Sequence, residues 1–138
     1  MAINGVIQRK FALLDKHWIE ITQRLEQVSL EQFKNDWGLR LMTERSLQVM
    51  VEIIIDVAER IVATLRAGPA ATASEAIEKL VHFEIIRSAT PYLPLVRFRN
   101  LIVHRYEEID PQIVYDIVQN HLELFRRFRD EVDTYGEV

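Results

Sequence analysis

Apolar residues recur in alternating steps of four and three along the N-terminal part of the chain. This seam consists of Ile7, Phe11, Leu14, Trp18, Ile21, Leu25 and Val28. Because an α-helix completes a turn in about 3.6 residues, these steps bring every seam residue to one side of a helix. We therefore predict a long amphipathic helix from Val6 to Val28 whose apolar side packs in a helical bundle.

A wider apolar face follows between residues 39 and 67. Its members are Leu47, Met50, Val51, Ile54, Ile55, Ala58, Ile61, Val62 and Leu65. Gly68 and Pro69 then supply the usual signals of a helix end. A face this wide has to be buried on several sides, so we predict that this second long helix is the central one.

Capping signals mark the starts of the other helices. They are Ser29 with Gln32, Thr72 with Glu75, Thr90 with Pro91, and Asp110 with Pro111. A hydroxyl or carboxylate at a helix start accepts a hydrogen bond from a free backbone N–H group, and proline fits the first turn. These signals predict a short helix over residues 29–35, a turn at 35–38, and helices over about 72–87, 90–106 and 110–133. In the last helix, the residues expected to face the core are Ile113, Ile117, Leu124, Phe125 and Phe128.

The fold class follows from this pattern, because no segment alternates polar and apolar residues as a strand would. We predict an all-α, up-and-down bundle of four to five helices joined by short loops. Four glycines and four prolines leave little room for linkers, so residues 1–138 are expected to form a single domain.

Charge and composition narrow the classes of function. The formal net charge of −4 counts against a general nucleic-acid coat, which normally carries a basic excess. The chain has no cysteine, which excludes disulfides and thiolate metal sites. Neither a signal peptide nor an apolar run of about 18 residues is present, so we expect a cytoplasmic protein without membrane association.

One segment departs from this acidic balance. Residues 96–106 contain three arginines together with Asn100, His104 and Tyr106, and no acidic residue. Isolated buried charge is costly unless it is paired or used. On a helix, Asn100 and His104 share a face, Arg97 lies a further turn back, and the long Arg99 side chain lies about 140° from His104. We predict that this segment is the functional site.

A structural interpretation of the same residues is that the histidine is hydrogen-bonded in the bundle and the arginines pair with Glu107, Glu108 or Asp110. The other histidines, His17, His82 and His121, lack the spacing of metal ligands, so no metal site is predicted. The basic cluster Arg126, Arg127 and Arg129 is expected to pair with nearby acids or, failing that, to extend a binding surface. Trp18 and Trp37 are expected to be packing residues.

The segment Arg99-Asn100-Leu101-Ile102-Val103-His104-Arg105-Tyr106 resembles the R-N-x-x-x-H-x-Y form of the R-x4-6-H signature of the HEPN superfamily. More narrowly, the chain is similar to HepT toxins of HepT–MntA toxin–antitoxin systems. The similarity extends to residues 44–48, 54–58 and 106–111, and to Val114-Tyr115, so it spans most of the chain.

This resemblance implies a homodimeric, metal-independent endoribonuclease toxin that needs no cofactor. Arg99, Asn100 and His104 would occupy the active-site positions at the dimer interface, and Asp56 would support them. Arg97, a turn back on the same predicted helix, is a second candidate for a supporting role. Tyr106 would be the tyrosine that an MntA-like nucleotidyltransferase antitoxin modifies with AMP from ATP. The preference of RNA-binding proteins for single-stranded loops points to tRNA or mRNA as the substrate.

The chemistry of these residues is consistent with RNA cleavage, because RNA carries its own nucleophile, the 2′-hydroxyl. A histidine can act as base or acid near neutral pH, and an arginine can stabilise the charge on the phosphate. One histidine per chain is half of an acid–base pair, which a twofold dimer would complete. Two competing hypotheses are a non-catalytic helical module that binds a nucleotide or docks a nucleotidyltransferase, and a purely structural dimeric bundle.

Overall fold

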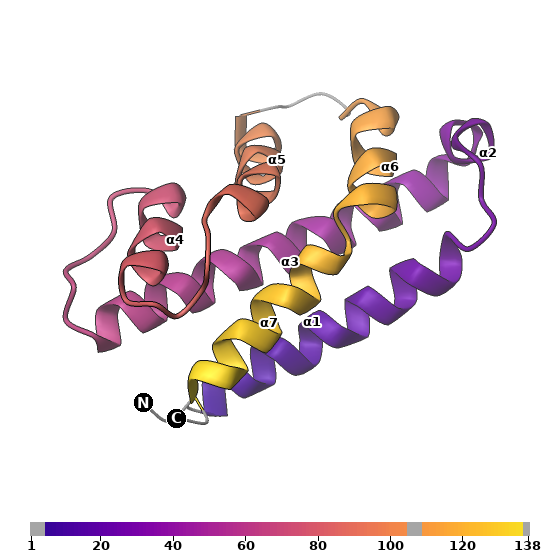
Figure 1. Ribbon diagram of the computed structural model, residues 1–138. Helices are drawn as coiled ribbons and strands as arrows, with labels where there is room; N and C mark the ends of the chain where they lie inside the picture. The colour runs from indigo at the N-terminus through magenta and orange to yellow at the C-terminus, as the bar shows by residue number, and fades with distance from the viewer. Residues whose placement is uncertain (1–4, 105–108, 137–138) are drawn as a thin grey trace.

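The computed structural model describes residues 5–104 and 109–136, with the side chains of Val103 and His104 outside this description. These residues form helices and no strands (Figure 1), which confirms the all-α fold class. In chain order the elements are α1 (Gly5–Arg24), α2 (Leu30–Asn35), α3 (Trp37–Thr64), α4 (Ala73–His82), the 3-10 helix η1 (Thr90–Tyr92), α5 (Leu93–His104), α6 (Pro111–Asn120) and α7 (Glu123–Gly136).

Helix α3 is the centre of the bundle, as its wide apolar face predicts. It packs against α1, α2, α4, α5, α6 and α7 (Figure 1). Residues on almost every side of its middle part are buried, including Ile53 and Val57 beside the predicted face. A helix surrounded in this way holds the other helices in place, including α5, which carries the predicted site.

The seam is also confirmed within α1, although the helix ends at Arg24 rather than at Val28 because the chain turns at Gln27, which has a positive φ of 61°. Ile7, Phe11, Leu14 and Ile21 are buried against α3 and α7. Trp18 packs at the edge of this core, where its indole Nε1 donates a hydrogen bond to the carbonyl of Leu122, 3.2 Å away. The regular apolar spacing therefore produces the packing that it predicts.

Three of the capping signals act as expected. Ser29 and Gln32 form a reciprocal capping box at the start of α2. The Asp110 carboxylate accepts a hydrogen bond from the backbone N–H of Gln112 at the start of α6, with Pro111 in the first turn. Thr72 likewise caps α4 by accepting from the N–H of Glu75.

The region around Asp36 differs from the prediction of a turn at residues 35–38. Asp36 ends α2 and at once caps α3, because its carboxylate accepts a hydrogen bond from the backbone N–H of Leu39. Helix α3 therefore begins at Trp37 rather than at Leu39. Trp37 is 63% exposed, so the prediction that it is a packing residue was wrong.

The predicted helix over residues 72–87 ends earlier, at His82. Glu84 adopts a positive φ of 61°, and the backbone N–H of Ile85 bonds back to the carbonyl of Leu80. This turn directs Ile85 and Ile86 into the core, where both are buried. Farther along, Thr90 does not cap α5 but begins η1, and α5 starts at Leu93.

The predicted last helix is two helices, α6 and α7, separated at His121 and Leu122. The break frees the carbonyl of Leu122 to accept the hydrogen bond from Trp18. It also allows α6 to pack on α2 while α7 packs on α1. Ile113, which was expected to face inward, is 39% exposed. None of the described helices has the length and apolar character to span a membrane.

Candidate functional site

Helix α5 is seated on the bundle by its apolar side. Leu95, Val96 and Phe98 are buried, which leaves Arg97 and Asn100 exposed and Arg99 partly exposed. At its start, the buried Tyr92 donates a hydrogen bond from its hydroxyl to Glu131 Oε2 of α7, 3.0 Å away. Burial and the Glu131 carboxylate raise the pKa of the Tyr92 hydroxyl above its usual value. The helix is therefore anchored while its polar side chains reach the surface.

Arg99 of the predicted site contacts the central helix α3. Its Nε lies 3.2 Å from Glu52 Oε1 on α3, within hydrogen-bonding and ion-pairing distance. The Arg99 side chain is 33% exposed and that of Glu52 is 47% exposed. Within the described part of the chain, the Arg99 guanidinium makes no other hydrogen bond or ion pair. Among the described residues, the contact of the Arg99 guanidinium is therefore made through Nε, with Glu52.

Arg97 lies on a different side of α5 from Arg99. It borders a groove of about 740 Å³ between α5 and α6. The other lining residues are Pro94, Phe98, Leu101, Asp110, Gln112, Ile113, Asp116, Ile117 and His121. The floor of this groove is apolar and its rim carries both charges, so the structure does not bring Arg97 and Arg99 to one point.

His104 is the last residue of α5, and its backbone position agrees with the predicted helix. Its side chain lies outside the described part of the structure, as does the whole of Tyr106. The predicted arrangement of His104 with Arg99 and Asn100, and the position of the Tyr106 hydroxyl, therefore stay predictions.

Asp56, which was predicted to support the site, contacts two basic residues. Its Oδ2 lies 2.7 Å from Lys10 Nζ on α1 and 2.9 Å from Arg60 Nε, one turn along α3. Partial burial tends to raise the pKa of Asp56, but the hydrogen bonds and charges of Lys10 and Arg60 outweigh it and lower that pKa. The carboxylate that contacts Arg99 is instead Glu52, one turn before Asp56.

Sequence reasoning missed Glu52. The available signal was an isolated acidic residue within the apolar run of residues 49–55 in the central helix. Such a residue needs a nearby cation or solvent. The identity of the cation, however, depends on how α5 packs against α3.

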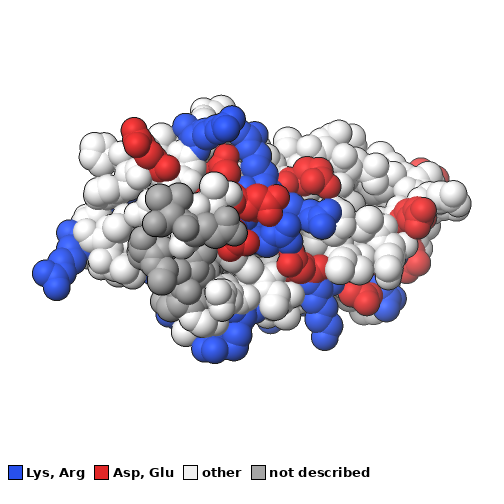
Figure 2. All heavy atoms as spheres, turned by 60° about the horizontal axis from the view of Figure 1, so that its bottom comes forward, with Lys and Arg blue, Asp and Glu red and all other residues white. Residues whose placement is uncertain are grey.

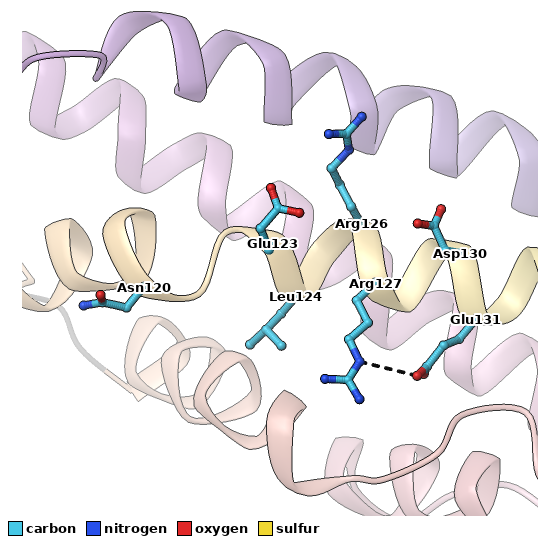
Figure 3. A pocket seen from close by; sticks show the side chains of 7 residues that line it. All are labelled: Asn120, Glu123, Leu124, Arg126, Arg127, Asp130 and Glu131. Carbon is cyan, nitrogen blue, oxygen red and sulfur yellow. Dashed lines mark hydrogen bonds and ion pairs between the residues drawn. The ribbon is translucent and has the colours of Figure 1, made fainter.

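In the second basic cluster, Arg127 and Arg129 are paired with acids, as predicted. Arg129 contacts Asp15 and Asp130, and Arg127 Nε lies 3.5 Å from Glu131 Oε1 (Figure 3). The guanidinium of Arg126 lies over the Trp18 ring, 4.1 Å from its centroid. Basic and acidic side chains alternate across the middle of the face seen in Figure 2. Arg126 and Arg127 border a pocket of about 460 Å³, and all three arginines have partners within the fold.

A protein family described as Ribonuclease HepT-like matches residues 14–132 of this chain. That range includes α5 and the pair formed by Arg99 and Glu52. The chain belongs to this HepT-like family. The match confirms the family predicted from the Arg99 to Tyr106 segment, and it covers the helical bundle from α1 into α7.

Individual HepT-like proteins are similar along nearly their whole length. A tRNA nuclease HepT of Aphanizomenon flos-aquae is 26% identical over 132 residues, covering 94% of this chain and 89% of the relative. An mRNA nuclease HepT of Shewanella oneidensis is 29% identical over 134 residues, covering 94% and 98%. The structure of a tri-AMPylated HEPN toxin of Shewanella oneidensis in complex with MNT antitoxin superposes with a TM-score of 0.84. It is 29% identical, and the alignment covers 96% of this chain and 99% of that one.

Proposed function

We propose that this protein is the toxin of a toxin–antitoxin pair and acts as a metal-independent endoribonuclease on tRNA or mRNA. The observation that carries the proposal is the match of the HepT-like ribonuclease family to residues 14–132. The names of the two nuclease relatives support RNA as the substrate class. The position of Arg99, partly exposed on a helix anchored to the core, supports α5 as the site.

In this proposal Arg99, Asn100 and His104 act on the scissile phosphate. His104 removes the proton from the 2′-hydroxyl, or delivers one to the leaving 5′-oxygen. Arg99 stabilises the negative charge that builds on the phosphate oxygens, and Asn100 orients the phosphate. The 2′-oxygen forms a bond to phosphorus as the bond to the 5′-oxygen breaks, which leaves a 2′,3′-cyclic phosphate and a 5′-hydroxyl.

We further propose that the active form is a homodimer in which the sites of two chains meet. A single His104 cannot be base and acid in the same step. Two copies related by a twofold axis would supply both, because a twofold interface presents the same residues from each side. In this proposal Arg97, which borders the groove between α5 and α6, has a supporting role beside the site.

The test is cleavage of single-stranded RNA and tRNA by purified protein in the presence of EDTA. We expect Arg99→Ala and His104→Ala each to lower the rate by at least about 100-fold, since each removes a group that acts in the transition state. Arg87→Ala, which removes another exposed arginine, is the matched control. Undiminished cleavage by His104→Ala would contradict the proposal. RNA or partner binding without cleavage by the wild type would favour the non-catalytic module instead.

We propose that a nucleotidyltransferase antitoxin of the MntA type silences the toxin by adding AMP from ATP to Tyr106. The similar structure of a tri-AMPylated HEPN toxin in complex with MNT antitoxin supports this proposal. Each addition brings negative charge and bulk two residues from His104, where it would compete with RNA phosphate for the same donors.

The modification is tested by mass spectrometry after incubation with the antitoxin and ATP. The wild type should gain one or more AMP masses, and Tyr106→Phe should gain none. Tyr135→Phe is the control and should be modified like the wild type. Full modification of Tyr106→Phe would place the acceptor elsewhere.

A further inference from the structure

We propose that Glu52 is a positioning residue that holds the Arg99 guanidinium in the orientation needed to bind the scissile phosphate. Glu52 Oε1 lies 3.2 Å from Arg99 Nε, and the two residues come from α3 and α5, 47 positions apart in the chain. This inference rests on the proposed function of α5. It adds a residue of the central helix to that site.

The atom that Glu52 contacts decides the consequence for Arg99. A guanidinium has five N–H groups in a rigid plane, one on Nε and four on the terminal nitrogens. A carboxylate that accepts from Nε fixes the plane but leaves the terminal nitrogens to form paired hydrogen bonds with phosphate oxygens. Within the described residues, no other partner occupies the Arg99 guanidinium.

The backbone that carries Glu52 is held in place by the core, which suits a positioning residue. Its neighbours Val51 and Ile53 are 1% and 5% exposed, so the backbone at this position is fixed by the core. The other acidic residue on this stripe of α3, Asp56, is neutralised by Lys10 and Arg60. Glu52 is thus the carboxylate of α3 that contacts Arg99, while Asp56 joins α3 to α1.

Steady-state kinetics on single-stranded RNA tests the role in cleavage. A misplacement of about 1 Å in a catalytic group can lower a rate about 100-fold. We therefore expect Glu52→Ala to lower kcat by about 10- to 100-fold with a smaller change in KM. Glu52→Gln keeps an oxygen acceptor for Nε and should restore most of the rate. Glu59→Ala removes an exposed glutamate two turns along the same helix and should cleave like the wild type.

A double-mutant cycle separates positioning from a general loss of structure. If Glu52 acts through Arg99, Glu52→Ala should cause no further loss of rate in an Arg99→Ala background. Additive losses, or a Glu52→Ala protein as active as the wild type, would overturn the proposal. A faster Glu52→Ala enzyme would also overturn it, because Glu52 would then be restraining Arg99 from the substrate.

A second readout does not depend on cleavage. In NMR spectra of the full chain, the Nε–H proton of Arg99 should exchange slowly in the wild type and in Glu52→Gln, and rapidly in Glu52→Ala. Binding of a 2′-O-methylated RNA, which cannot be cleaved, should weaken in Glu52→Ala and not in Glu59→Ala. These results would support Glu52 even if the wild type cleaved no RNA and the proposed nuclease function failed. Unchanged exchange and unchanged RNA binding in Glu52→Ala would overturn the inference about Glu52 and leave the proposed nuclease function standing.

Discussion

His17 and Ser46 show how single polar residues join two helices inside this bundle. His17 Nδ1 on α1 lies 3.0 Å from Ser46 Oγ on α3, and Ser46 is 7% exposed. Burial lowers the pKa of His17 below 6.5, and the charges of Lys16 and Arg45 act in the same direction. The nearby Glu20 opposes them with a smaller effect. The folded protein therefore favours neutral His17 more strongly than the unfolded chain does.

This difference predicts how stability depends on pH. Because the pKa of His17 is lower in the folded state, its contribution is fully present above about pH 6.5 and is lost as the pH falls through the folded-state pKa. When the pH is lowered from 7.5 to 5.5, the free energy of unfolding measured with urea should fall more for the wild type than for His17→Gln. The exposed His82 provides the control, and His82→Gln should behave like the wild type. Equal losses in the wild type and His17→Gln would refute this assignment.

At the level of elements, two adjacent residues fix the start of α6, which forms one wall of the groove beside Arg97. Ile109, just before the helix, is 8% exposed and belongs to the core. The next residue, Asp110, accepts a hydrogen bond from the backbone N–H of Gln112 at 2.9 Å. A buried anchor followed directly by a cap sets where α6 begins.

Asp110→Ala should lower the free energy of unfolding by about 1 kcal/mol, because the backbone N–H of Gln112 loses its acceptor. Asp110→Asn retains an oxygen at the same place and should cost much less. Chemical denaturation of the two variants and the wild type measures the difference. Equal stability of the alanine and asparagine variants would show that the side-chain cap contributes nothing.

At the level of the whole molecule, one connected core joins the helices. Phe128 of α7 packs edge-on against Phe11 of α1 and Tyr92 of η1, with ring centroids 6.4 and 5.5 Å apart. Tyr92 in turn is the last residue of η1 and directly precedes α5. Removal of Phe128 would therefore disturb contacts that tie the candidate site to the opposite side of the bundle.

Phe128→Ala should lower the free energy of unfolding by about 3–5 kcal/mol through lost burial and the cavity it leaves. Phe83→Ala, at a residue that is 39% exposed, should cost far less. Fluorescence of variants that retain only Trp18 or only Trp37 reports unfolding at two places in the molecule. With a single core, the two signals should change at the same urea concentration, and separate transitions would contradict this.

Sequence reasoning recovered what neighbouring residues encode. The seam of α1, the wide face of α3 and the caps at Ser29 and Asp110 depend on spacings of a few residues, which determine helix faces and helix starts. The Arg99 to Tyr106 segment was recognisable for the same reason, since its residues lie close together in the chain. This segment by itself indicates the family.

Packing between distant residues determined the rest. Glu52 contacts Arg99 across 47 positions, and the break between α6 and α7 leaves the Leu122 carbonyl for Trp18, 104 positions away. Local preferences permitted one continuous last helix and a buried Trp37. The fold departs from these local preferences because helix propensity contributes less free energy than burial and hydrogen bonding between distant residues. The sequence alone therefore identifies the segment that carries the candidate site, and the tertiary structure supplies the partner of Arg99.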